Sequence, residues 1–193
     1  MAKKATQDKI IDAAIDLIRE RGYKAATTKV IAEKAGVNEV TIFRHFGNKR
    51  GILESAVQKF SFAPQLSKVI EEEMVWELEE DLYTIASEYQ AFIMNIKDFV
   101  LIGFREAGMF PEIDEEIAKI PRQLKKQLMN YFDIMEKKGK LSANNKEAVV
   151  MSFIAMNFGF FMSRARLGTS VSEVTIEEFL NNGIRVFSRG LTP

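Results

Sequence analysis

The sequence predicts an all-α protein in which a small N-terminal unit of three helices precedes a larger helical domain. Apolar residues recur every three or four positions along most of the 193-residue chain, and no segment alternates in the manner of a strand. Glycine and proline fall between the periodic segments, where helices end. We therefore expect a first domain over residues 1–48 and a second, helical domain over residues 49–193.

The composition is that of a globular protein, since 47% of the residues are hydrophobic, 28% are charged and only 4 are proline. We expect no membrane span and a cytoplasmic location, because no uninterrupted apolar run reaches the roughly 18 residues that a span needs and the N-terminus lacks a signal peptide. The absence of cysteine and the single histidine argue against thiolate and histidine chemistry. We expect no catalytic residues, no metal and no cofactor.

Charge is unevenly distributed along a chain whose formal net charge is +0. Residues 1–60 hold 12 Lys and Arg against 7 Asp and Glu, whereas residues 61–193 hold 15 against 20. A basic first part suits a nucleic-acid partner, because Lys and Arg neutralise phosphates. An excess of this size is also common on solvated surfaces, so it needs support from the local pattern.

The first helix is predicted from Gln7 to Arg21. Acidic residues come early in this segment and arginines late, which suits the helix dipole. Gly22 is placed to take the left-handed conformation that ends a helix. One face of the helix carries an apolar stripe of residues three and four apart, namely Ile10, Ile11, Ala14, Leu17 and Ile18.

Two short helices are predicted next, joined by a turn of three or four residues. Thr27 is placed to cap the first of them, and Gly36 to end it. Asn38 is placed to cap the second, which we expect over Glu39–Phe46.

The residues at this junction suit two helices that cross at a steep angle. Ala32 supplies the small contact residue, Gly36 the turn, and Ile42 and Phe46 an inner face. A helix-turn-helix of this kind presents its second helix to the major groove of DNA. The alternative is an ordinary helical hairpin, because such turns also occur in bundles that do not bind DNA.

The segment from Ile10 to Leu53 resembles the N-terminal domain of the TetR family, in which a recognition helix leads into an aromatic-rich Y-x-H-F-x-x-K stretch. The matching run here is AGVNEVTIFRHFGNKRGIL. The resemblance implies a double-stranded DNA operator as partner. Three positions depart from the pattern: Phe43 replaces the usual tyrosine, Val40 a frequent glycine and Val30 a common acidic residue.

The resemblance also implies which residues contact DNA. Base-edge contacts fall to Glu39, Val40, Thr41 and Arg44, and phosphate contacts fall to Thr27, Lys29, His45 and Lys49. Phe43 lacks the hydroxyl of tyrosine, and its ring is expected to pack against the sugar backbone. The alternatives are solvated surface charges for Glu39 and Arg44, and a structural role for His45.

The second domain is predicted to be helical throughout, and the residues beyond Ser61 hold 12 of the 15 phenylalanines and 8 of the 9 methionines. Thr175 and Glu178 are expected to form a capping box at the start of the last helix. Pro121 is expected to kink or break the helix over residues 112–138. The expected helices span residues 49–61, 67–97, 99–108, 112–138, 144–167 and 176–189.

A strip of small residues on the penultimate helix predicts close packing against another helix; it comprises Ser152, Ala155, Gly159 and Ser163. The TetR resemblance implies that the last two helices pair with their copies in a four-helix homodimer interface, which suits this strip together with Phe158 and Phe187. The alternative is that the penultimate helix is buried within its own subunit.

Phenylalanine and methionine form adaptable apolar walls, and the resemblance implies a ligand pocket within this domain. We expect an apolar or amphipathic effector. The candidate lining is Phe92, Phe99, Met109, Met129, Phe132, Phe153, Met156 and Phe160, with Asn157, Tyr131 and Arg105 as polar anchors.

The TetR resemblance, together with these patterns, implies a ligand-released repressor that binds an inverted-repeat operator as a homodimer on the bacterial nucleoid. The alternative is a DNA-binding protein without an effector, which organises chromosomal regions or recruits a protein partner. An all-helical enzyme is disfavoured, because the carboxylates are dispersed and the run Glu71–Glu73 suits a solvated helix face.

Overall fold

The computed structural model describes residues 2–193, with side chains from Lys4 onward. Every regular element in this range is a helix and none is a strand, which confirms the predicted all-α class. The described chain forms two compact units. The first comprises the residues up to Ser61 together with Asp98–Lys119, and the second comprises Phe62–Lys97 together with Ile120–Pro193.

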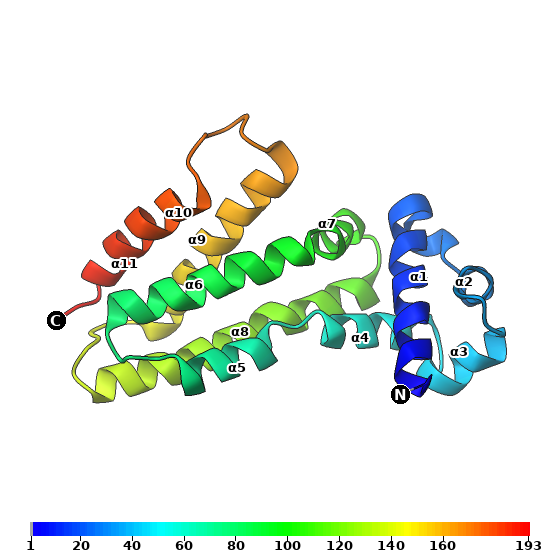
Figure 1. Ribbon diagram of the computed structural model, residues 1–193, viewed down its shortest axis with the longest axis horizontal. Helices are drawn as coiled ribbons and strands as arrows, with labels where there is room; N and C mark the ends of the chain where they lie inside the picture. The colour runs from blue at the N-terminus through cyan, green and yellow to red at the C-terminus, as the bar shows by residue number, and fades with distance from the viewer. Residues whose placement is uncertain (1) are drawn as a thin grey trace. The chain divides into compact units, whose positions relative to one another are not determined.

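The first unit contains four N-terminal helices and residues from two later ones (Figure 1). The first helix begins earlier than predicted and continues past Gly22, whose φ of 79° interrupts its regular geometry where a helix end was expected. The helices are α1 (Ala2–Ala25), α2 (Thr28–Ala35), α3 (Glu39–Phe46), α4 (Lys49–Lys59), α7 (Lys97–Glu106) and the first part of α8 (Pro111–Lys137).

The predicted helix-turn-helix is formed by α2 and α3. Thr27 caps α2 by accepting a hydrogen bond from the Val30 amide, and Asn38 caps α3 by accepting one from the Val40 amide. Gly36 has φ 67° and ψ 37°, a left-handed conformation that suits glycine. Each of these local predictions is confirmed.

The core of the first unit draws on both stretches of the chain. Ile10, Ile31 and Ile42 have no exposed surface, and Ile113 of α8 belongs to the same buried cluster. Phe99 of α7 packs against this cluster. The helix-turn-helix is therefore supported by side chains that lie far beyond it in sequence, while the functional division at residue 48 remains a prediction.

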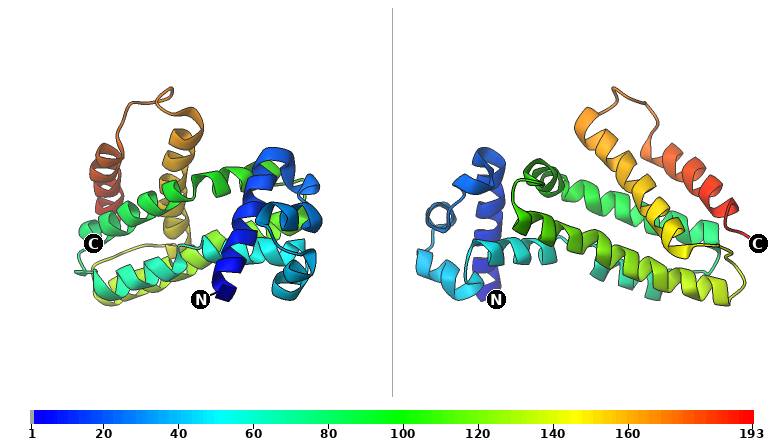
Figure 2. Two further views of the ribbon diagram at one scale, coloured as in Figure 1. Left: turned by 45° about the vertical axis from the view of Figure 1, so that its right-hand side comes forward. Right: turned by 180° about the vertical axis from the view of Figure 1, so that it is seen from behind.

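The second unit contains the remaining helices (Figures 1 and 2). In each view α9 and the run from α10 to α11 lie side by side as a hairpin. The helices are α5 (Ala63–Glu72), α6 (Leu78–Asn95), the second part of α8, α9 (Lys146–Leu167), α10 (Ile176–Phe179) and α11 (Arg185–Arg189), with a π-helical turn at Leu180–Ile184.

The helix predicted over 67–97 is wrong, because α5 ends at Glu72 and α6 begins at Leu78. Trp76 lies between them with φ 62°, and its ring stacks on Tyr131 with centroids 6.2 Å apart. The Val75 amide donates to Asp81 Oδ1 at 2.9 Å. These contacts stabilise a break that the local sequence does not signal.

Pro121 does not end α8, which continues from Pro111 to Lys137. Of the two outcomes expected for this proline, the break is wrong. Pro121 is exposed, and a proline on an exposed face is tolerated when the carbonyl that loses its donor can bond to water.

The last predicted helix begins as expected. The Glu178 amide donates to Thr175 Oγ1 at 3.1 Å, and the Thr175 amide donates to Glu178 Oε2 at 2.8 Å, so the capping box is confirmed. The helical run then continues through α10, the π-helical turn and α11.

Among the described helices, α9 alone has the length and composition of a membrane span, although the sequence led us to expect none. Core helices of soluble proteins share these properties, and α9 packs within its own unit. Phe160 stacks on Phe179 with centroids 4.1 Å apart, and Phe153 lies 5.5 Å from Phe187. Only 28% of its apolar window is buried, however.

Candidate nucleic-acid interface

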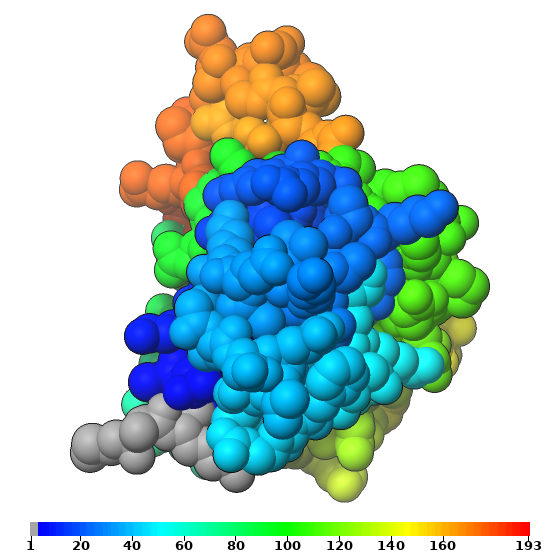
Figure 3. Space-filling model, turned by 90° about the vertical axis from the view of Figure 1, so that its right-hand side faces the viewer, coloured from blue at the N-terminus to red at the C-terminus, as the bar shows by residue number. Residues whose placement is uncertain are grey.

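The outer face of α3 carries the residues predicted to contact base edges. Val40 is 70% exposed and Arg44 is exposed, while Glu39 and Thr41 are half-buried. Ile42 on the opposite face is fully buried, so α3 is anchored from within. Figure 3 shows α2 and α3 at the surface of the first unit. The structure therefore brings these side chains together on one accessible helix.

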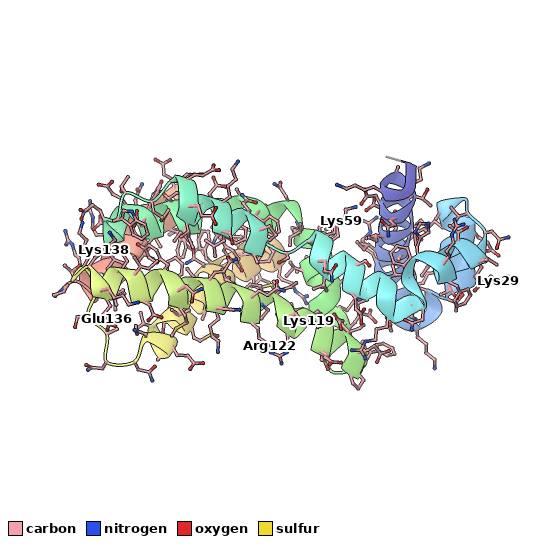
Figure 4. All side chains as sticks on the ribbon, turned by 90° about the horizontal axis from the view of Figure 1, so that it is seen from below. Lys29, Lys59, Lys119, Arg122, Glu136 and Lys138 are labelled. Atoms are coloured by element: carbon pink, nitrogen blue, oxygen red, sulfur yellow. The ribbon has the colours of Figure 1, made fainter. Side chains whose placement is uncertain are left out.

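Three of the predicted phosphate contacts lie around this face. Lys29 is exposed and points to solvent (Figure 4). Thr27 Oγ1 accepts from the Val30 amide at 3.3 Å, which leaves its hydroxyl hydrogen available. His45 is half-buried, and its Nδ1 has no hydrogen-bond partner among the described residues.

Lys49 is held inside the first unit rather than left free. Its Nζ donates to the Tyr23 carbonyl at 2.7 Å and lies 3.7 Å from the centroid of the Tyr23 ring. Burial lowers the pKa of this ammonium group. The predicted phosphate contact would have to be made by a side chain that already donates to a carbonyl near the C-terminal end of α1.

The C-terminal end of α1 is also bonded by two residues of α7. Glu106 is 4% exposed and accepts from the Tyr23 amide at 3.0 Å. Arg105 donates to the carbonyls of Ile18 and Arg19. Sequence reasoning placed Arg105 in a ligand pocket and overlooked Glu106, because no short-range pattern connects residues more than 80 positions apart.

A second set of contacts joins α4 to the start of α8. Arg50 forms ion pairs with Glu115 and Glu116, and Glu116 also pairs with Lys119. The Glu116 side chain is only 1% exposed, and a buried carboxylate requires such partners. Sequence reasoning did not single out Arg50.

Thr28 is another residue that sequence reasoning missed. Its hydroxyl donates to Glu39 Oε1 at 2.7 Å and so connects the first residue of α2 to the first residue of α3. The eleven-residue separation gives no periodic signal that would identify the pair.

The first unit contains a small cavity of about 30 Å³ between α1, α4, α7 and α8. A cavity of this size holds little more than one water molecule. Its lining is apolar apart from a few groups that include Lys49 and Glu106. Of the predicted effector contacts, Phe99 lies in this lining.

The predicted effector contacts are divided between the two units. Phe99, Arg105 and Met109 belong to the first, where Met109 is 58% exposed. The other eight belong to the second, namely Phe92, Met129, Tyr131, Phe132, Phe153, Met156, Asn157 and Phe160.

Within the second unit, Tyr131 and Phe132 have no exposed surface. The Tyr131 hydroxyl donates to Asp81 Oδ2 at 2.8 Å, and burial raises the pKa of this phenol. Phe92 lies 5.1 Å from Phe62 between ring centroids. Tyr131 is therefore already satisfied by the protein, whatever its further role.

Asn157 lies in a buried amide pair that joins α6 to α9. Gln90 and Asn157 are 2% and 1% exposed, and Gln90 Nε2 donates to the Asn157 carbonyl at 2.9 Å. Asn157 Nδ2 donates to the Phe153 carbonyl. Gln90 Oε1 has no partner among the described residues, which leaves a buried acceptor unsatisfied.

The predicted strip of small residues lies on the uncovered side of α9. Ser152, Ala155 and Gly159 are exposed, whereas Ser163 and Phe158 are half-buried. Phe187 of α11, which is also half-buried, packs against Phe153. A Cβ added at Gly159 would have no other atom of the described residues within 4 Å.

An anchored and capped α2–α3 pair with an exposed second helix defines a helix-turn-helix DNA-binding protein. Residues 10–56 match the sequence model of the bacterial regulatory proteins of the tetR family. The HTH-type transcriptional regulator YvkB of Bacillus subtilis is 34% identical over 187 residues, which are 97% of each chain. The chain belongs to the TetR family of bacterial transcriptional regulators, and it is not an enzyme.

A more distant relative is IcaR of Staphylococcus aureus, named as the negative transcriptional regulator of the biofilm operon icaADBC. It is 27% identical over 156 residues, which cover 77% of this chain and 80% of IcaR.

Two solved structures are similar in fold. NalD of Pseudomonas aeruginosa, described as the secondary repressor of the MexAB-OprM multidrug efflux pump, has a TM-score of 0.80 at 17% identity, over 100% of this chain and 98% of NalD. FadR of Bacillus subtilis, solved with stearoyl-CoA, has a TM-score of 0.75 at 19% identity, over 94% of this chain and 97% of FadR. Both support the predicted fold, in which a small N-terminal helical unit precedes a larger helical domain.

Proposed function

We propose that this regulator is a ligand-released repressor that binds an inverted-repeat operator as a homodimer, on the nucleoid of the bacterial cytoplasm. The observation that carries the proposal is α3, whose inner Ile42 is fully buried while its outer Val40 is 70% exposed. The name of IcaR, a negative regulator, supports repression.

The roles proposed for the DNA-contacting residues follow their placement. Residues on the outer face of α3 contact base edges and set sequence preference, whereas residues beside it contact phosphate and set affinity and register. The first group is Glu39, Val40, Thr41 and Arg44; the second is Thr27, Lys29, His45 and Lys49, with Phe43 against the sugar backbone.

The proposed dimer uses α9 and the α10–α11 run of each subunit. Most of the apolar window of α9 is uncovered in one chain, and Ala155 and Gly159 allow another helix to approach closely. Burying such a surface between two copies removes apolar area from water. A dimer also suits an operator with two half-sites, because one short recognition helix reads few base pairs.

The proposed effector is apolar or amphipathic. Phenylalanine and methionine dominate the candidate lining in the second unit, and FadR was solved with stearoyl-CoA. Gln90 Oε1 offers an unpaired acceptor for such a ligand, and Asn157, to which Gln90 is bonded, is the second proposed polar contact. Arg105 contacts an effector only if it releases the α1 carbonyls that it now binds.

Release requires an effector that binds the DNA-free conformation more tightly than the DNA-bound one, with coupling of roughly 1 to 3 kcal/mol. The proposed change alters the spacing of the two recognition helices.

The second candidate function, DNA binding without an effector, is favoured by the close aromatic packing of the second unit, in which Tyr131, Phe132 and Phe161 have no exposed surface.

The proposal is tested by incubating the full-length protein with fragmented genomic DNA at physiological salt and sequencing the retained fragments. A short inverted repeat near promoters is expected. Scattered sites away from promoters would favour the effector-free candidate, and no enrichment would contradict operator binding.

A further inference from the structure

The pair of Thr28 and Glu39 links the two helices of the DNA-binding motif. The Thr28 hydroxyl donates to Glu39 Oε1 at 2.7 Å, and both side chains are half-buried. The neighbouring Thr27 has a different task, because its oxygen accepts from the Val30 amide and caps α2. The Thr28 hydroxyl is therefore not needed for the cap and can donate to a residue of α3.

We propose that Thr28 positions the Glu39 carboxylate so that its second oxygen accepts a hydrogen bond from the N4 amino group of a cytosine at one fixed position of each operator half-site. This inference rests on the proposed function, since it requires α3 to enter the major groove. It makes Thr28 a positioning residue and Glu39 the residue that discriminates the base.

The bond to Thr28 occupies one carboxylate oxygen and leaves the other. Glu39 Oε2 has no hydrogen-bond partner within residues 4–193. An unrestrained glutamate samples many rotamers and loses that freedom on binding. Because Oε1 is already bound, Oε2 is restricted to a small region at the start of the recognition helix.

The chemistry of the carboxylate selects the base. An ionised carboxylate only accepts hydrogen bonds, and the cytosine N4 group is a donor in the major groove. Guanine and thymine present acceptors there, and adenine places an acceptor next to its N6 donor. The negative charge also repels phosphate, so Glu39 contributes discrimination rather than general affinity.

A purely structural role for the pair predicts a different outcome. If the bond only ties α2 to α3, substitutions at either residue lower stability and reduce binding to all sequences alike. If the pair reads DNA, substitutions change the preference at one half-site position and leave the other positions intact.

The experiment measures base preference at every half-site position by selecting a randomised operator library with the full-length protein and its variants. Glu39→Gln keeps an oxygen for Thr28 and replaces the free oxygen with an amide donor. The wild type is expected to prefer cytosine about tenfold at one position. Glu39→Gln is expected to prefer guanine or thymine there, since these bases present acceptors.

Two further variants test the positioning role. Thr28→Val removes the donor at nearly constant volume and is expected to flatten the preference at that same position, while Thr28→Ser restores it. Lys29→Ala is the matched control on α2 and is expected to weaken binding to all sequences without changing the preference. Thermal unfolding of each variant verifies that it is folded.

An unchanged base preference in Glu39→Gln and Thr28→Val would overturn the inference and leave operator binding in place. A preference for guanine, adenine or thymine in the wild type at the affected position would also overturn it. If the wild-type protein enriches no sequence at all, operator binding itself fails and the inference fails with it.

Discussion

Glu106 of α7 accepts a hydrogen bond from the Tyr23 amide at 3.0 Å, although the two residues are 83 positions apart. Gly22 precedes Tyr23 with φ 79°, and a Cβ added to it would lie 3.7 Å from the Glu106 carboxylate. The end of α1 is thus shaped by a buried acid from a later helix, which makes α7 part of the support for the DNA-binding motif.

Replacing Glu106 with alanine is expected to lower the free energy of unfolding by about 1 to 3 kcal/mol, because the buried Tyr23 amide loses its acceptor. Chemical denaturation followed by circular dichroism measures this change. Glu106→Gln keeps an acceptor oxygen and is the matched control, so equal losses in both variants would show that the hydrogen bond to Tyr23 is not the cause.

Ala155→Arg is expected to produce monomers, because a long charged side chain on the exposed strip of α9 prevents close approach of a second copy. Light scattering after size-exclusion chromatography measures the mass. Lys125→Arg, which introduces the same side chain elsewhere in the second unit without changing the charge there, serves as the control. A dimeric Ala155→Arg protein would place the interface elsewhere.

Lys29→Ala is expected to reduce the slope of log affinity against log salt by about one, since an exposed phosphate contact is lost.

Lys49→Ala distinguishes two roles of the Lys49 side chain. A smaller slope supports the predicted phosphate contact, whereas an unchanged slope with reduced stability shows that Lys49 serves only the Tyr23 carbonyl. Thr41→Ala is expected chiefly to relax sequence preference and leave the slope unchanged.

Alkaline conditions are expected to destabilise the first unit through Tyr23, because burial raises the pKa of its phenol from 10.0 to about 12. The folded state favours the neutral phenol, so its contribution is fully present below pH 10 and is lost as the pH rises toward 12. Denaturation between pH 9 and about 12 measures this loss. Tyr23→Phe is expected to lose less stability over that range than the wild type, and equal losses would contradict the assignment.

Local signals predicted the DNA-binding motif well. The caps at Thr27 and Asn38 and the left-handed Gly36 depend on residues within a few positions, and each lies where expected. The same holds for the capping box at Thr175. Hydrogen bonds between near neighbours can be inferred from sequence, because the helix geometry already places the partners together.

Features set by distant contacts could not be predicted in this way. The break between α5 and α6 depends on Trp76 stacking on Tyr131, which lies in another helix. Arg105 donates to α1 and Glu106 accepts from it, and Thr28 donates to Glu39, so these hydrogen bonds likewise join separate helices. Periodicity shows which face of a helix is apolar but not which distant partner meets it.

The central claim is that two copies of α3 read two half-sites at a fixed separation. The most direct measurement compares the affinity of the full-length protein for the genomically selected inverted repeat with its affinity for the same repeat widened by about 5 base pairs, half a helical turn. We predict one dimer on the native repeat and an affinity at least about tenfold lower on the widened one. Equal affinity for the two duplexes would contradict the account.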